Sequence, residues 1–112
     1  MQIKEKIIGD VAVLKFSGSL LGEPDATNVR KKIHSLVDDD MRKVVIDMGD
    51  LKWINSAGLG SLIAGLTTLR NAGGDLRLAR GPDNVESLFR ITDLVKVFKM
   101  YETIEGAVAS FK

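Results

Sequence analysis

Cysteine is absent from the 112 residues, which excludes disulfides, thiol catalysis and thiolate metal sites together. An excess of either charge is also lacking, since sixteen Lys and Arg face fifteen Asp and Glu and leave a net charge of +1. With no global field to attract a polyanion, we expect no nucleic-acid partner. No long apolar run occurs, and the alternating start MQIKEKIIGDVAVLKF is typical of neither a signal peptide nor a membrane span. We therefore expect a cytoplasmic protein with no direct membrane insertion.

What is present fits an ordinary globular domain, with 45% hydrophobic and 28% charged residues over a length that suits one domain, residues 1–112. The spacing of apolar residues predicts an α/β fold with a mixed, mostly parallel sheet and an antiparallel N-terminal hairpin, in the order ββαβαβαβα. Gly9-Asp10 forms the predicted hairpin turn, Gly73-Gly74 ends the second helix, and Thr103 caps the last one. The predicted strands are 2–8, 11–17, 43–48, 75–79 and 97–101, and the predicted helices are 24–37, 57–72, 82–91 and the segment after Thr103.

Residues 50–61, DLKWINSAGLGS, are the most informative segment, because they lead from a buried strand into the second helix. Binding sites in such sheets lie at the carboxyl ends of strands. Ser56 stands at the start of the helix, and from the pattern alone a plain N-cap is the simpler interpretation of this serine. Trp53, the single tryptophan, is expected to be an anchor in the core or at its boundary.

The helix over 57–72 has an unusual side. Its leucines and Ile63 are predicted to face inward, whereas no charged residue occurs from Ala57 to Leu69. A water-facing helix side normally carries lysine and glutamate, so the opposite side is either a docking surface or packed inside the domain. The pattern leaves these two interpretations equally open. The small residues on that side are Ala57, Ser61, Ala64, Thr68 and Asn71.

Enzyme motifs are incomplete in this segment. Gly58 and Gly60 lack the third glycine of a dinucleotide fingerprint, and no lysine follows as in a phosphate-binding loop. A nucleophile elbow would need glycine where Ile54 stands. His34, the one histidine, is interpreted as a boundary residue of the first helix. We therefore expect no enzymatic activity, and no metal or cofactor in this chain.

Two stretches resemble a known family. The run Asp50-Leu51 and Ile54-Asn55-Ser56-Ala57-Gly58-Leu59-Gly60 is similar to the switch segment of anti-sigma factor antagonists, which are STAS domain proteins. The order of strands and helices agrees as well, so the resemblance covers nearly the whole chain. The second stretch, which resembles the C-terminal half of the family, consists of Val85, Leu88, Ile91-Thr92, Leu94, Val97-Phe98, Tyr101 and Glu105-x-Ala107.

The resemblance implies a partner-binding switch. Ser56 matches the serine phosphorylated by an anti-sigma factor that is itself a serine protein kinase, and a serine phosphatase would reset it. Unphosphorylated, the chain would bind that kinase and free a sigma factor. Gly58 and Gly60 match the glycines that let the helix start lie close to the partner. Together with the small-residue side of the helix, the predicted partner-binding residues are Gly18, Leu20, Leu21, Glu23, Asp25, Asn55, Ser56, Ala57, Gly58, Gly60, Ser61, Ala64 and Thr68.

The sequence departs from the family pattern at two places. Asn55 stands where the family often has aspartate, and the stretch Leu20 to Asp25 lacks an aspartate directly after its first leucine. Two alternatives remain. The same fold serves as an unphosphorylated scaffold subunit of a stress-signalling assembly or as a companion of a lipid or anion transporter. A chain of another class would be a small ligand-binding protein or enzyme that uses the Ser56 loop.

Overall fold

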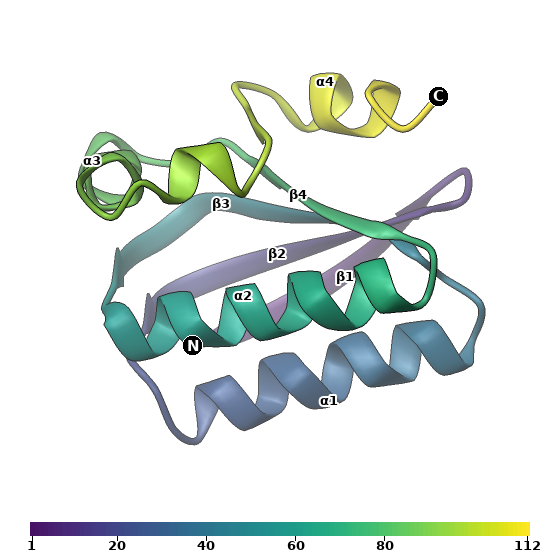
Figure 1. The fold of residues 1–112 in the computed structure, drawn as a ribbon, viewed down its shortest axis with the longest axis horizontal. Coiled ribbons are helices and arrows are strands. Elements are labelled where there is room, and N and C mark those ends of the chain that lie inside the picture. The colour runs from purple at the N-terminus through teal and green to yellow at the C-terminus, as the bar shows by residue number, and fades with distance from the viewer.

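The chain opens with a β-hairpin and then alternates helices and strands, as the apolar spacing predicts. The computed structural model describes residues 1–112 (Figure 1). Besides the helices and strands it contains one short 3-10 helix, η1, at Leu94–Lys96. The strands are β1 (Gln2–Ile8), β2 (Val11–Leu20), β3 (Lys43–Ile54), β4 (Asp75–Ala79) and β5 (Met100–Tyr101), and the helices are α1 (Asp25–Asp38), α2 (Ser56–Asn71), α3 (Asp83–Ile91) and α4 (Ile104–Ala109).

The five strands form one sheet in the order β1-β2-β3-β4-β5. β1 pairs with β2 in antiparallel fashion, and the other three pairings are parallel. Gly9 has φ +61° in the two-residue turn between β1 and β2, a conformation that glycine adopts at little cost. The predicted fold class, a mostly parallel sheet with an antiparallel hairpin at its edge, is confirmed.

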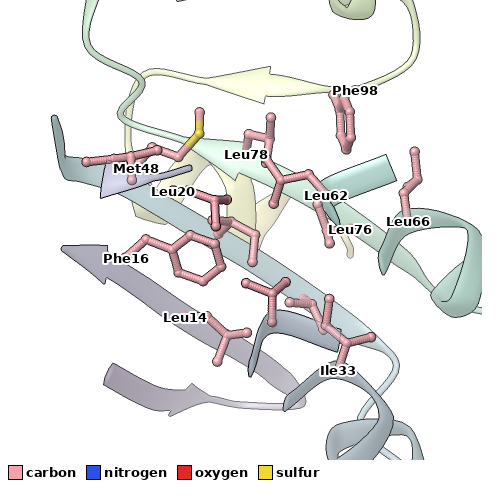
Figure 2. Close-up of a cluster of buried hydrophobic side chains, with 14 of the residues drawn as sticks. Leu14, Phe16, Leu20, Ile33, Met48, Leu62, Leu66, Leu76, Leu78 and Phe98 are labelled. Atoms are coloured by element: carbon pink, nitrogen blue, oxygen red, sulfur yellow. The ribbon is translucent and has the colours of Figure 1, made fainter. Parts of the chain in front are cut away.

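The helices cover the two faces of the sheet unequally. α1 and α2 lie side by side on one face (Figure 1), where Val85 and Phe89 of α3 join the same core, whereas α4 packs on the other face. Side chains along β2 alternate between these faces, so Leu14 and Phe16 enter a core of 21 buried residues that also holds Leu62 of α2 (Figure 2). Val11 and Val13 point the other way, into a cluster of six buried residues with Val108 of α4. The larger core therefore lies beneath α1, α2 and α3, and the smaller one beneath α4.

β2 and β3 are both longer than predicted. We expected them to end at residues 17 and 48, but they continue to Leu20 and Ile54 as a parallel pair that contains two register irregularities. β4 pairs with β3 only as far as Asp47, so the extensions run beyond the rest of the sheet. Leu20 and Ile54 are fully buried, and their burial holds the extended pair in place. One segment predicted to contact a partner therefore begins within β2, at Gly18, and the other follows directly from β3.

β5 is shorter than predicted, spanning Met100–Tyr101 instead of 97–101. Asp93 adopts a left-handed conformation, and the N–H groups of Val97 and Phe98 both donate to the carbonyl of Leu94 at 3.0 Å. These turn hydrogen bonds keep the segment before Lys99 out of the sheet. None of the four helices combines the length and the hydrophobicity that a bilayer-spanning helix needs.

Candidate functional site

The structure brings the two predicted contact segments together at the carboxyl ends of β2 and β3. Leu20 pairs with Ile54 in the sheet, and the N–H of Asn55 donates to the Leu20 carbonyl at 3.3 Å. The side-chain amide of Asn55 also donates to the carbonyl of Leu21 at 3.0 Å. The β2–α1 loop, residues 21–24, therefore lies against the start of α2, where parallel sheets place their binding sites.

Ser56 is the first residue of α2, and its side chain is exposed. The N-cap is Asn55, whose Oδ1 accepts a hydrogen bond from the Gly58 N–H at 2.9 Å. The interpretation of Ser56 as a plain N-cap is therefore wrong, because the preceding side chain fills that position. The Ser56 hydroxyl is not committed to capping, and it stands next to the positive end of the helix dipole.

The exposed side of α2 is a strip of uncharged residues. Ile63 is part of it at 37% exposure, so the prediction that Ile63 faces inward is wrong. Of the predicted small-residue side, Ala57 and Ala64 are exposed, whereas Ser61 and Thr68 are half-buried. The strip, called the α2 surface below, consists of Ser56, Ala57, Gly60, Ile63, Ala64 and Thr67.

Packing against α1 explains only some of the small residues in α2. Gly65 is buried, and a Cβ built on it would overlap Cδ1 of Ile33 in α1. The two helices pack closely on that side because Gly65 has no side chain. Ala57 and Ala64, on the α2 surface, remain open. Internal packing thus explains the Gly65 side of the helix, and it leaves the α2 surface without a partner inside the chain.

The two glycines of the resemblance differ in their surroundings. A Cβ on Gly58 would overlap the carbonyl oxygen of Leu20 and come within 2.8 Å of Ile54 Cγ1. Gly58 therefore lets α2 approach the chain's own strands, and its prediction as a partner contact is corrected. A Cβ on Gly60 would meet no atom within 4 Å. Only Gly60 lies open at the surface.

The predicted residues around the β2–α1 loop also divide into buried and exposed ones. Leu20 is fully buried in the core, so its side chain is unable to touch a partner and that prediction is corrected. Leu21, in contrast, is 51% exposed. Glu23 is exposed and accepts a hydrogen bond from Thr27, whereas Gly18 and Asp25 are half-buried. Of the predicted residues, Leu21 and Glu23 are the ones whose side chains this segment presents to solvent.

Trp53 is 45% exposed, so the prediction of a core or boundary anchor is wrong. It lies in the extension of β3, opposite Ser19 of β2, where the register is irregular. One signal in the sequence does indicate the extension: Leu51 and Ile54 are apolar and three positions apart, which fits a strand with an irregularity between them. Extending the strand would have placed Trp53 between two buried residues.

Charged groups with defined partners lie elsewhere in the sheet. Buried Asp47 accepts hydrogen bonds from the Gly49 N–H at 3.0 Å and from Arg80 at 3.4 Å. A hydrogen bond from Lys15 lowers the pKa of the exposed Asp50 carboxyl, and the two groups are 2.9 Å apart. No ionisable side chain occurs in α2 from Ser56 to Leu69. The α2 surface therefore carries no side-chain charge of its own.

A helix start with an exposed serine, placed at the ends of two parallel strands, matches the arrangement implied by the resemblance. The family model of the STAS domain matches residues 2–107. The chain belongs to the STAS domain family.

The chain is similar to one curated protein by sequence and to two solved structures by fold. BtrV of Bordetella bronchiseptica, whose name gives it a proposed role as an anti-sigma factor antagonist, is 30% identical over 93 residues, covering 83% of this chain and 80% of BtrV. The crystal structure of a Thermotoga maritima protein named for the same proposed role aligns with TM-score 0.88 at 24% identity, over 96% of this chain and 92% of that one. The Bacillus cell-fate determinant SpoIIAA in its phosphorylated form aligns with TM-score 0.76 at 17% identity, over 99% and 100%.

Proposed function

We propose that this protein is an anti-sigma factor antagonist, and that phosphorylation of Ser56 controls its binding to an anti-sigma factor with serine kinase activity. One observation carries the proposal: Ser56 is exposed at the start of α2 and is not the N-cap, beside a helix surface without charge. The relatedness to BtrV supports the role, and the fold shared with phosphorylated SpoIIAA supports this kind of control.

In the unphosphorylated state the α2 surface and the β2–α1 loop form the docking surface. Small residues such as Ala57, Gly60 and Ala64 let a partner's backbone come close, and no charged side chain has to be dehydrated there. The exposed aliphatic side chains Leu21 and Ile63 add apolar area to be buried. Binding of the anti-sigma factor at this surface would release its sigma factor.

Phosphorylation changes the energy of docking more than the energy of folding. A phosphate on Ser56 adds about −1.5 to −2 charges. The helix N-terminus favours an anion, so the fold tolerates the group or gains slightly from it. Docking would bury the hydrated dianion against the partner, and a loss of about 3–4 kcal/mol weakens binding several hundredfold. A serine phosphatase would restore binding.

This role makes the chain a binding protein and a kinase substrate. The Ser56 hydroxyl oxygen attacks the γ-phosphorus of ATP within the kinase, ADP leaves, and a base of the kinase accepts the hydroxyl proton. The kinase also holds the magnesium ions. The chain itself needs neither a metal nor a cofactor for the switch.

The proposal is tested with Ser56→Asp, with Ser87→Asp on the exposed side of α3 as the matched control. We expect Ser56→Asp to lower affinity for the kinase at least about tenfold, since one carboxylate carries less charge than phosphate. The melting temperature should stay near that of the wild type. Ser87→Asp should change neither quantity. Binding of Ser56→Asp as tight as wild type, or its unfolding, would contradict the mechanism.

Intact-mass analysis of the protein from its native cells provides the second test. Fragment mapping should place one phosphate on Ser56, and a co-purified protein should have serine kinase activity toward the wild type and none toward Ser56→Ala. Capture of a transporter or a stress-complex subunit, together with an unmodified Ser56, would instead favour the scaffold or transporter role.

A further inference from the structure

Asn55 makes two side-chain hydrogen bonds that join the helix start to the neighbouring loop. Its Oδ1 accepts from the Gly58 N–H at 2.9 Å, and its Nδ2 donates to the Leu21 carbonyl at 3.0 Å. The first bond caps α2, and the second fixes the backbone of the β2–α1 loop. One end of the side chain must accept while the other end must donate.

This requirement selects an amide among the residues that cap helices. Aspartate is an equally good N-cap, but its ionised carboxylate only accepts hydrogen bonds. At position 55 its second oxygen would face the carbonyl oxygen of Leu21 without a proton between them. Replacing Asn55 by aspartate would therefore keep the cap and lose the bond to the loop. Capping alone therefore does not explain the amide at position 55, whereas the hydrogen bond to the Leu21 carbonyl does.

The bond to Leu21 holds a loop whose own backbone fits closely against α2. Gly22 follows Leu21, is buried, and has φ +115°, and a Cβ on it would lie 3.5 Å from Cβ of Ala57. The carbonyl of Gly22 accepts from the Ala26 N–H at 2.9 Å, which links the loop to the first turn of α1. The hydrogen bonds from Asn55 and from the Ala26 N–H thus hold the backbone around Leu21, whose surface is 51% exposed.

We infer that Asn55 is a positioning residue, which holds the β2–α1 loop so that Leu21 enters an apolar pocket of the partner as an aliphatic anchor. Loop and α2 surface then act as one preformed docking surface. Binding energy in such interfaces concentrates in a few side chains that fill pockets, and a loop ordered in advance loses less entropy when it binds. The partner part of this inference rests on the proposed function, whereas the loop part is independent of it.

The loop part is tested without a partner, by hydrogen exchange of Asn55→Asp followed with NMR. The Gly58 amide reports on the cap and should exchange as slowly as in the wild type or more slowly. The Ala26 amide reports on the loop and should exchange about threefold to tenfold faster, because the bond to Leu21 is lost. General destabilisation would accelerate both amides, so this divergence distinguishes positioning from a merely structural role.

Asn84→Asp is the matched control, because Nδ2 of Asn84 donates to the Lys52 carbonyl at 2.8 Å on a different part of the chain. It removes a comparable bond and should leave Ala26 unchanged. Equal acceleration of Ala26 and Gly58 in Asn55→Asp, or no acceleration at Ala26, would overturn the positioning role.

The partner part is tested by a double-mutant cycle against the kinase that phosphorylates Ser56. Leu21→Ala should weaken binding about thirtyfold, as expected for an anchor in a pocket. Asn55→Asp should weaken it about threefold to tenfold when Leu21 is present, but less than about twofold in the Leu21→Ala background. Leu21→Ala and Ile63→Ala should instead combine additively, because Ile63 lies on α2 and is not held by the bond between Asn55 and Leu21.

Equal effects of Asn55→Asp in both backgrounds would show that it does not act through Leu21, and would overturn the anchor. A wild-type chain that binds no such kinase would contradict the proposed function. In that case the exchange experiment still decides whether Asn55 positions the loop, so the two failures are distinguishable.

Discussion

α1 and α2 lie next to each other on the same face of the sheet and differ on their outer sides (Figure 1). Both contribute buried apolar residues to the same core, including Ile33 from α1 and Leu62 from α2. The outer side of α1 carries exposed Arg30, Lys31 and His34, as a water-facing helix normally does. The outer side of α2 is the uncharged α2 surface. Both helices thus bury an apolar side in the same core, but only α1 has a charged outer side.

The difference shows that folding does not require an uncharged exterior at this place. α1 folds against the same core with cations outside, so α2 would tolerate them too. The uncharged residues of the α2 surface therefore support the proposed contact with another molecule. The helix starts differ as well, since α1 begins after Pro24 without a side-chain cap, whereas Asn55 caps α2 and binds the adjacent loop.

The largest effect is expected when α2 is given a charge. Ala64→Glu should weaken binding of the kinase about a hundredfold, because the carboxylate would have to be buried against the partner without a matching cation. Ser35→Glu on the outer side of α1 is the control and should bind like the wild type. Titration calorimetry measures both affinities. Unfolding of Ala64→Glu in circular dichroism would show that this side is internal, contrary to its exposure.

A smaller effect, this time on stability, is expected from the two glycines at the start of α2. Gly58→Ala should lower the free energy of unfolding by about 1–3 kcal/mol, because its Cβ would overlap the Leu20 carbonyl oxygen. Gly60→Ala meets no neighbouring atom and should raise it by up to about 1 kcal/mol, since alanine favours the helix. Urea denaturation compares the two variants. Similar stabilities would mean that α2 does not rest on β2 as closely as described.

The smallest effect is expected on α1. Lys31→Ala removes an exposed cation from its outer side and should change the free energy of unfolding by less than about 0.5 kcal/mol. Affinity for the kinase should stay within about twofold of the wild type, because α1's exterior is not part of the docking surface. A marked loss of affinity would extend the docking surface onto α1 and remove the contrast between the helices.

Features with local causes were predicted correctly. Gly73 has φ +86° just beyond α2, and the Gly74 N–H donates to the Leu69 carbonyl at 2.7 Å, as expected of a glycine-terminated helix. Thr103 caps α4 by accepting from the Gly106 N–H at 2.9 Å. Each of these signals acts within a few residues of the chain.

Most of the errors concern features that depend on a distant neighbour. The N-cap is an exception, since Asn55 caps α2 through the nearby Gly58 N–H and is as good a capping residue as Ser56. The second bond of Asn55, to Leu21, does depend on the pairing of β2 with β3. Ile63 lies at the edge of the apolar side of α2, and its exposure depends on how that helix is rotated against the sheet. Leu20 looked like part of a loop because the strand pairing that buries it was not visible locally.

The sequence by itself determined the order of strands and helices, the hairpin turn, the helix ends at Gly73 and Thr103, and the uncharged stretch of α2, since these follow from residue type and short-range spacing. Only the tertiary structure decided that β2 and β3 extend together, that Leu20 and Gly58 lie inside, and that Asn55 joins the loop to the helix. Those outcomes depend on contacts between residues more than thirty positions apart in the sequence. Such residues come within hydrogen-bond or van der Waals distance only when the sheet forms.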